Sequence, residues 1–464
     1  MTIPIEVGSV ADHALSRALR PRHVFMITIG GIIGAGLFVG SSAAISAAGP
    51  AVIISYMLTG LLIFLIMRML GEMAVGMPRV RSFTEFARAG LGNWAGFTVG
   101  WLYWYFWVIV VPVEAIAGAT ILQHWFHLEN WKIGGALMVL MTAVNLLSAR
   151  SFGEFEFWFS SIKVSAIIAF ILLAASYAFG LTSGIGPTVS NLYIHNGFAP
   201  LGYRAVLAAV TTVIFSMMGA EIVTIAAAES AEPARAVARM TSTVISRIML
   251  FYVGSILMIV CVLPWNLVKS GQSPFTDALA VMHVPWAWTI MSLIILTAVL
   301  SCLNSSFYIA SRVLFVLAER GDAPRWLVKT NPRLVPARSV LLASAAGFAG
   351  VLAAVVSPGG VFAFLVNASG ALILFIYLAI AVSQVRLRRL ALRQGAPPPA
   401  LPMWWFPWLS YFAIAAMSAV LVAMAFTPAM ASQLWISVLS VAVALLAYLW
   451  VRQRRLSSSP PYAK

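Results

Sequence analysis

The chain has 464 residues, of which 61% are hydrophobic and only 9% are charged, and its mean hydropathy is +0.95. A soluble domain carries about a quarter charged residues, so this composition excludes an ordinary soluble protein and predicts an integral membrane protein. The net charge of +15 does not indicate nucleic-acid binding, because the basic residues fall in short connections between apolar segments and not along one basic face.

Windows of about 20 apolar residues predict twelve membrane-spanning helices, here called spans one to twelve. They cover residues 24–48, 51–77, 95–122, 133–150, 155–180, 204–228, 244–266, 286–317, 339–356, 361–384, 406–427 and 432–451. With the N-terminus in the cytoplasm, the outer connections hold only Lys132, Lys269 and Arg204, and most of the other basic residues lie in the inner connections. This bias predicts that both termini are cytoplasmic.

Two connections are expected to carry short helices of their own. In the inner connection 78–94, Phe83, Phe86 and Ala87 recur at helical spacing, which is typical of an interfacial helix. The segment from Phe275 to Met282 predicts a similar helix on the outer side.

Span one contains the stretch IGGIIGAGLF at residues 29–38, in which four of the seven residues from Gly30 to Gly36 are glycine. Glycine weakens a helix interior. In lipid, a broken helix leaves backbone groups unpaired, which is tolerated only where the break lines a cavity or meets a ligand. The stretch therefore predicts either a binding site or, alternatively, close helix packing through small residues.

Span six contains the stretch FSMMGAEIVT at residues 215–224, which places Gly219 and the ionisable Glu221 in an apolar segment. A charged Glu at the bilayer centre costs at least about 2.5–3.5 kcal/mol on insertion scales, so such a residue marks function or a satisfied structural pair. Spans one and six each open a set of five spans. Interrupted helices at matching positions of two halves favour a transporter site over packing alone.

Two opposed helix ends at these breaks suit a zwitterion. The amides of Gly34, Ala35 and Gly36 would face a carboxylate, with the positive end of a helix dipole behind them. The carbonyls between Phe215 and Met218 would face an ammonium group. The expected partner is therefore a small amino acid.

Other function classes lack their motifs. The chain has no GxxxxGK[ST] phosphate loop for an ATPase, and no HExxH or GxSxG motif for a membrane-embedded enzyme. A transporter-like nutrient sensor would need an added soluble output domain, and no such domain is inserted here. We expect a protein that is not an enzyme and that uses no cofactor and no metal.

Further stretches complete a family pattern. They are MRMLGEMA at 67–74, WLYWYFW at 101–107, PVEA at 112–115, GAEIVTIAAAES at 219–230, SCLNS at 301–305 and RGDAP at 320–324. Over nearly its whole length the chain resembles the amino acid–polyamine–organocation superfamily, and within it the amino acid transporter family of bacterial permeases, with most likeness to the gamma-aminobutyrate (GABA) permeases.

The resemblance implies an all-α membrane fold with two inverted five-helix repeats. The repeats would occupy 24–180 and 204–384, followed by helices eleven and twelve at 406–451, with cytoplasmic tails at 1–23 and 452–464. The function it implies is import of GABA by proton symport with alternating access in the bacterial inner membrane. Alternatives are a permease for an aromatic amino acid, proline or a cationic amino acid, or an exchanger. The oligomeric state stays open, and lipid is the expected surrounding.

The resemblance also implies the substrate contacts. It supports the carboxylate position at Gly34, Ala35 and Gly36, and it puts the amine near Ile32, Phe215 and Met218, with Phe215 closing over the substrate. One departure concerns the loop after span two, where the family has an acidic residue and a glycine. Here the loop reads PRVRS at 78–82, which removes support for gating by that loop.

Three ionisable residues have competing roles. Lys163 lies about eight residues into span five, where loss of hydration eases proton release, and the resemblance implies a coupling role. The alternative is a lysine that snorkels to the surface or pairs with Glu154 or Glu156. Glu221 is either a proton-responsive gate or a carboxylate that ties spans one and six together. Glu114 is either a partner of the substrate amine or a structural carboxylate.

Several other residues are weaker candidates. Cys302 borders the expected site and could contact substrate, and Ser369 belongs to a polar interruption in span ten that could serve as a gate; packing is the alternative for both. Both cysteines are expected to be reduced. Glu72 is expected to be a satisfied interfacial charge. The aromatic run at 101–107 is expected to be an interface belt and packing.

Overall fold

The structure, a computed structural model, describes residues 19, 21–30, 33–77, 80, 82–182, 187–228, 237, 246–356, 361, 364–365, 368–369 and 371–457. The described residues are helical, with no strand among them. Eight stretches within them are long and apolar enough to cross a membrane, and the two segments Gly202–Ile214 and Ile248–Val262 are apolar but shorter. The expected all-α membrane fold is confirmed, while the count of twelve spans stays a prediction.

The first half of the chain forms eight α-helices. They are α1 (Pro21–Gly30), α2 (Ala35–Phe38), α3 (Ser41–Ala48), α4 (Val52–Gly76), α5 (Phe83–Leu91), α6 (Asn93–Leu122), α7 (Asn130–Leu147) and α8 (Ala149–Ala178). Span one thus consists of α1 to α3.

The second half continues with shorter and longer elements. They are α9 (Asn191–Ile194), α10 (Gly202–Ser216), α11 (Ile222–Ala228), the π-helical η2 (Ile248–Gly254), α13 (Ser255–Val262), α14 (Pro274–Val281), α15 (Ala287–Glu319), α16 (Ala337–Val356), α18 (Leu372–Arg393), α19 (Trp408–Ala425) and α20 (Pro428–Ser457). Span six consists of α10 and α11.

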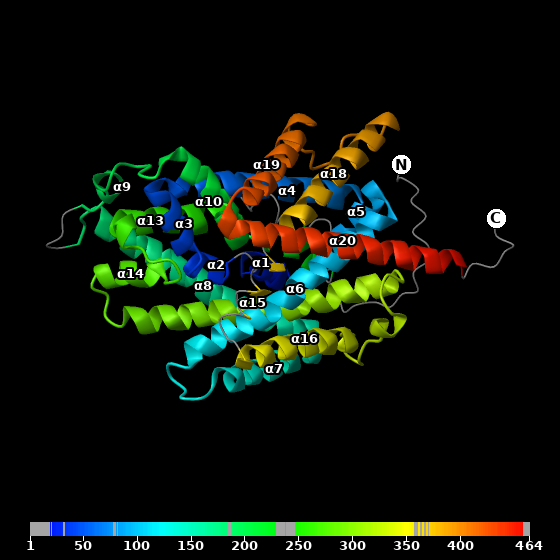
Figure 1. The fold of residues 1–464 in the computed structure, drawn as a ribbon, viewed down its shortest axis with the longest axis horizontal. Coiled ribbons are helices and arrows are strands. Elements are labelled where there is room, and N and C mark those ends of the chain that lie inside the picture. Colours follow the sequence, from blue (N-terminus) through cyan, green and yellow to red (C-terminus); the bar gives the residue numbers. More distant parts are fainter. Residues whose placement is uncertain are drawn as a thin grey trace.

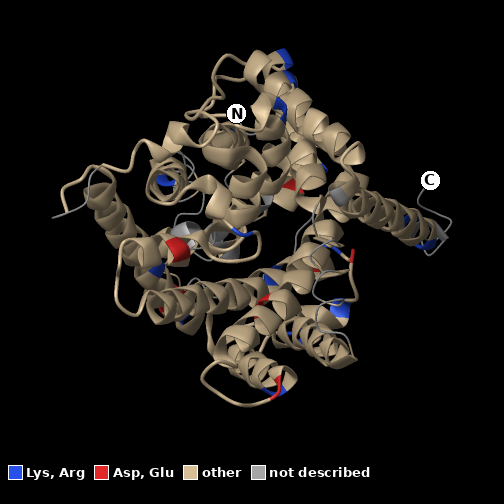
Figure 2. Ribbon diagram, turned by 60° about the vertical axis from the view of Figure 1, so that its left-hand side comes forward, with Lys and Arg blue, Asp and Glu red and all other residues tan. Residues whose placement is uncertain are grey.

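The long helices α6 and α15 form the most extensive contact in the described structure and lie together near its middle (Figure 1). Helix α1 packs mainly on α8, and α10 packs on α3 and α4. The short helix α5 and the end of α20 lie at one end of the molecule, and α9 and α14 lie at the opposite end (Figure 1). Charged positions are sparse along most of the ribbon (Figure 2), as expected for a chain whose solvent is lipid.

Both short helices occur where the sequence predicts them. The amphipathic α5 begins after Ser82, whose hydroxyl accepts the Thr84 amide at 3.3 Å, a normal N-cap. It ends at Gly92, which has φ +103 and thereby turns the chain directly into α6. The other short helix, α14, buries Phe275 between Phe38 and Phe170, with ring centroids 5.1 and 4.7 Å apart.

Two helix ends differ from the expected boundaries. Helix α18 continues to Arg393, beyond the predicted edge at 384, and α20 continues to Ser457, into the predicted tail that begins at 452. An apolar window ends at the first charges, but Arg stems can extend along a helix that has already left the hydrocarbon. Hydropathy therefore marks the membrane boundary and not the end of the helix.

Ion pairs fasten α5 to the turn that follows α15. Arg88 bonds Asp322 and also donates to Glu85 at 3.1 Å, and Arg320 pairs with Glu85 at 2.6 Å. The predicted interfacial helix is thus joined to the RGDAP turn. Of the departing loop sequence at 78–82, positions 78, 79 and 81 lie outside the described residues.

Candidate functional site

Span one is interrupted as the glycines predict. Helix α1 ends at Gly30 and α2 begins at Ala35, while Ile33 and Gly34 between them are not helical. Ile32 lies outside the described residues. A methyl group built on Gly34 would meet no heavy atom of the described residues within 4 Å. The backbone at Gly34 therefore borders open space, as a site for a ligand requires.

Gly36 has a different environment from Gly34. A methyl group there would lie 2.8 Å from the Cα of Ser216, at the end of α10. Gly36 therefore lets the two breaks approach each other closely, which is the close-packing role expected of small residues in membrane helices. The close-packing alternative therefore describes Gly36, while a binding role at Gly34 stays a prediction.

The break in span six is closed by its own carboxylate. Helix α10 ends at Ser216, α11 begins at Ile222, and Gly219 between them has φ +108. The fully buried Glu221 accepts hydrogen bonds from the Tyr103 hydroxyl at 3.1 Å, the Tyr377 hydroxyl at 2.6 Å and the Gly219 amide at 3.2 Å. Among the described residues its partners thus lie on α6, on α18 and in its own turn, whereas the structural alternative expected them on span one.

One carbonyl of this break already has a donor. The Tyr252 hydroxyl donates to the Ser216 carbonyl at 2.8 Å. Met218 is half-buried, and the Phe215 side chain lies outside what the structure describes. Among the carbonyls predicted for an ammonium group, that of Ser216 is therefore occupied by a phenol.

Lys163 is fully buried and points inward. Its Nζ donates to the Ile33 carbonyl at 2.9 Å and to the Ser301 hydroxyl at 2.8 Å. The first bond attaches α8 to the break in span one, and the second attaches it to α15. This is not the geometry of a snorkelling lysine, whose ammonium group reaches water.

Ser301 connects Lys163 to a second buried charge. Its hydroxyl donates to Glu156 Oε1 at 2.5 Å, and Ser160 donates to the same oxygen at 3.2 Å. Glu156 is fully buried, and its Oε2 has no hydrogen-bond partner among the described residues. From the sequence, Glu156 is expected only as a possible ion-pair partner of Lys163. Its seven-residue spacing from Lys163, which puts both side chains on one face of the helix, is the sequence feature that indicates a shared network.

Glu114 and Cys302 meet near Lys163. Glu114, on α6, is buried, and its Oε2 has no hydrogen-bond partner among the described residues. The Cys302 side chain, on α15, lies beside Glu114, and both groups lie within Coulombic range of Lys163. Cys302 is half-buried, whereas the other free cysteine, Cys261, is buried.

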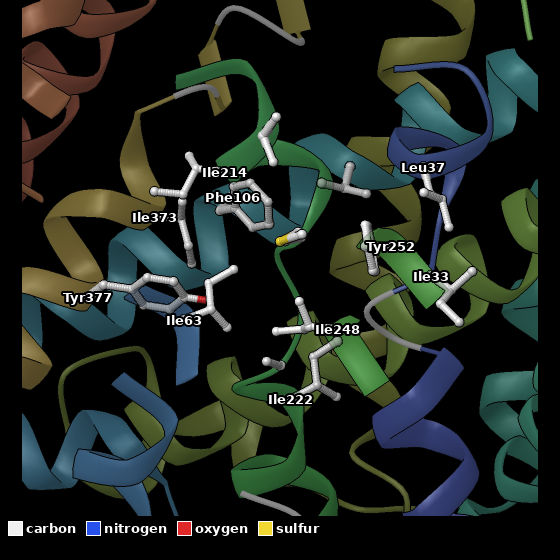
Figure 3. Packing of buried hydrophobic residues seen from close by; sticks show 14 of the residues in the cluster. Ile33, Leu37, Ile63, Phe106, Ile214, Ile222, Ile248, Tyr252, Ile373 and Tyr377 are labelled. Carbon is white, nitrogen blue, oxygen red and sulfur yellow. The ribbon is translucent and has the colours of Figure 1, made fainter. Parts of the chain in front are cut away.

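Buried apolar side chains from several helices pack together beside the two breaks. Figure 3 shows Ile33 and Leu37 of span one beside Tyr252, with Ile222 and Ile248 below them and Phe106 and Tyr377 opposite. All of these side chains are buried. Because such walls exclude water, electrostatic interactions inside them are stronger than at a surface.

The remaining candidates, Glu72 and Ser369, are both buried. Glu72 accepts from Gln384 at 3.1 Å and from the Met403 amide at 2.5 Å, so it is a satisfied charge at the junction of α4, α18 and the segment before α19. Ser369 is buried next to Ala371, whose amide donates to Ser437 of α20 at 3.2 Å. Asn367 and Gly370, its expected polar neighbours, lie outside the described residues.

The aromatic run on α6 is mainly interior packing. Tyr103 and Trp107 are buried and contact each other edge to face, with centroids 6.0 Å apart, and Trp101 and Trp104 do so at 5.3 Å. Sequence reasoning did not connect Tyr103 with Glu221. No local pattern links them, because they are 118 residues apart in the chain.

Comparison with known proteins identifies the family of the chain. The amino acid permease family model matches residues 23–458. A gamma-aminobutyric acid permease of Bacillus subtilis is 46% identical over 449 residues, covering 96% of each chain, and a probable GABA permease of Pseudomonas aeruginosa is 47% identical over 422 residues, covering 88% of each.

The fold likeness extends further than the sequence likeness. The crystal structure of a manganese transporter from Eremococcus coleocola superposes with a TM-score of 0.57 at 14% identity, covering 98% of this chain and 97% of that one. At this identity the likeness concerns the fold alone. The sequence matches are far closer and run from α1 to α20. The chain is a multi-pass membrane transporter, not an enzyme, and it belongs to the amino acid permease family.

Proposed function

We propose that this permease imports GABA by proton symport with alternating access, in the bacterial inner membrane with both termini in the cytoplasm. The observation that carries the proposal is the unwound turn at Ile33 and Gly34. It borders open space at Gly34 and is held through the Ile33 carbonyl by the buried Lys163. The names of the similar permeases support the choice of substrate.

In this proposal the substrate carboxylate binds the backbone of the span-one break. The amides of Gly34, Ala35 and Gly36 supply donors without a competing side chain at Gly34. Gly36 keeps this backbone against Ser216, so the break in span six buttresses the carboxylate site. Ile32, Phe215 and Met218 complete the proposed pocket.

The amine is proposed to bind Glu114. An α-amino acid carries its ammonium group next to the carboxylate, where the carbonyls of the span-six break would receive it. The Ser216 carbonyl already accepts from Tyr252. GABA separates its two charges by three methylene groups, so its ammonium group can extend toward Glu114, which lies beside Cys302 and whose buried Oε2 has no hydrogen-bond partner among the described residues. A charge-assisted hydrogen bond to a carboxylate is about twice as strong as a neutral one.

Proton coupling is proposed to act through Lys163. A protonated lysine donates charge-assisted hydrogen bonds to Ile33 and Ser301, which hold α8 and α15 against the break. Loss of the proton weakens both bonds and frees the break to move. The charge on Lys163 would thereby bias the equilibrium between conformations, as a two-state coupling mechanism requires.

The direct test is uptake of labelled GABA into proteoliposomes with and without an inward proton gradient, in competition with a panel of amino acids. We expect gradient-driven accumulation that GABA and similar ω-amino acids block best. Accumulation of an aromatic amino acid, proline or a cationic amino acid in its place would overturn the substrate. Uptake that requires internal substrate and ignores the gradient would identify an exchanger.

A second test locates the amine end of the site. In a Cys261→Ser background, Cys302 is the one cysteine left in the chain. We expect a small thiol reagent to label Cys302 and GABA to slow that labelling, because the half-buried thiol adjoins Glu114. Labelling that saturating GABA leaves unchanged would contradict the position proposed for the amine.

A further inference from the structure

We infer that Glu156 is the internal proton acceptor for Lys163, reached through the hydroxyl of Ser301. This deepens the proposed function and rests on its proton coupling. The relay gives the proton a path from Lys163 toward the start of α8. It assigns a transport role to Glu156 and Ser301.

The hydrogen bonds already have the order that a relay requires. Lys163 Nζ donates to Ser301 Oγ at 2.8 Å, and Ser301 Oγ donates to Glu156 Oε1 at 2.5 Å. Each donor thus points toward the next acceptor. All three side chains are fully buried, so bulk water does not compete for these bonds.

Glu156 also has capacity for a proton. Its Oε1 accepts from Ser301 and Ser160, while its Oε2 is buried without a hydrogen-bond partner among the described residues. A purely structural carboxylate is normally satisfied on both oxygens, as Glu221 is. Glu156 lies seven residues before Lys163 on α8, or about 10 Å nearer the start of the helix.

Charged and titratable groups lie on α8 and on the helices packed against it, and Tyr308 of α15 stacks on Phe152 of α8 with ring centroids 3.9 Å apart. On α8 itself Glu154 pairs with Arg22 at 2.5 Å and His23 at 3.1 Å, both of α1. The helices packed on α8 contribute the following groups: Cys302 and Arg312 from α15, Cys261 from α13, Lys132 near the start of α7, and Arg247 directly before η2. Glu114 of α6 and Cys302 lie, with Glu156, in Coulombic range of Lys163.

The proton step balances without any other reactant. One N–H bond of the Lys163 ammonium breaks as an O–H bond forms on Ser301. The original O–H bond of Ser301 breaks as an O–H bond forms on Glu156. Lys163 becomes a neutral amine, Glu156 becomes a carboxylic acid, and Ser301 ends unchanged. No electron is transferred.

Transport by three variants tests the relay. We expect Glu156→Gln and Ser301→Ala to lower gradient-driven accumulation by about 10²-fold, the low end of what a positioned proton-transfer group contributes. Exchange of labelled for unlabelled substrate should persist in both, because it needs no net proton movement. Ser301→Thr keeps the hydroxyl and should restore accumulation. Glu154→Gln, on the same helix but a third exposed, is the matched control and should keep the wild-type pH profile.

An infrared titration of the purified permease without substrate separates this inference from the transport proposal. We expect a carboxyl band that is lost in Glu156→Gln and titrates at a different pH in Lys163→Met. An unchanged carboxyl spectrum in Glu156→Gln, or wild-type accumulation by Ser301→Ala, would overturn the relay even if wild-type transport is as proposed. If the wild type does not use a proton gradient but shows the carboxyl band, the proposed proton symport is wrong. The assignment of Glu156 as a buried proton acceptor then still holds.

Discussion

The two broken spans of this permease are held in opposite ways. In span six the break is closed from within, because Glu221 satisfies two tyrosines of other helices and an amide of its own turn. In span one the break is held from outside, because Lys163 of α8 donates to the Ile33 carbonyl while Gly34 borders open space. One break is a junction between helices, and the other has space beside Gly34 among the described residues.

This difference separates two roles that the sequence pattern alone assigns to both breaks. An interrupted membrane helix marks a site when its free backbone groups are available to a ligand. At span six, the Glu221 carboxylate already accepts from the Gly219 amide, and the Tyr252 hydroxyl already donates to the Ser216 carbonyl. At span one a titratable side chain adjoins the open turn. Substrate binding and proton coupling are therefore expected to depend on span one, and the integrity of the helix bundle on span six.

The largest expected effect follows removal of the Glu221 carboxylate. Glu221→Ala would leave two buried hydroxyls and one amide without an acceptor, and each such loss costs about 1–3 kcal/mol. We expect low yield and a clearly lower Tm in detergent. Glu221→Gln keeps an acceptor oxygen and should recover most of the Tm. A Glu221→Ala protein with wild-type Tm would show that the span-six break is not a structural junction.

The second-largest effect is expected from a substitution at the contact between the two breaks. Gly36→Val would place a side chain against the Ser216 backbone, where a single methyl group already lies 2.8 Å away. Overpacking of this kind costs about 1–3 kcal/mol. We expect a moderate drop in Tm together with loss of uptake. Uptake at the wild-type rate would mean that the breaks are not closely packed.

A substitution at Gly34 is expected to reduce uptake without reducing stability. Gly34→Val should lower GABA uptake at least about tenfold, which corresponds to about 1.4 kcal/mol, because its side chain would fill the open space beside the amides. Its Tm should stay close to that of the wild type, since a methyl group there meets nothing within 4 Å among the described residues. Gly135→Val, on α7, is the control, because Gly135 has the same open surroundings but lies outside both breaks. Equal uptake by both variants would exclude the site.

The smallest effect is expected at the outer surface. Hydrogen bonds from Lys132 and Trp131 lower the pKa of the exposed Glu129 below its ordinary value. A lowered pKa stabilises the folded state at neutral pH, and this contribution is lost as the pH falls through the lowered pKa. We expect Glu129→Gln to change the Tm slightly at neutral pH and not at all in strong acid, with uptake unchanged. A change in uptake would be inconsistent with a role confined to the surface.

Much of the fold follows from local sequence signals. The apolar windows, the glycine stretch at 29–38 and the patterns that predict α5 and α14 are all properties of neighbouring residues. The burial of Lys163 follows in the same way from its position inside an apolar segment. The ends of α18 and α20 were not, because a helix can continue after its apolar window has ended.

The partners of the buried charges could not be read in this way. Lys163 contacts Ile33 across 130 residues, and Glu221 contacts Tyr377 across 156. No periodicity within one helix identifies such a pair. The distinction between Gly34 and Gly36 has the same origin, because only the approach of span six shows which glycine is packed.

Equilibrium binding of labelled GABA to purified Gly34→Val and Glu221→Gln, each compared with the wild type at matched folded concentration, tests the division between the two breaks most directly. The account predicts that Gly34→Val loses binding while Glu221→Gln binds with an affinity close to that of the wild type. Binding retained by Gly34→Val and lost by Glu221→Gln would contradict it and would move the substrate to the break in span six.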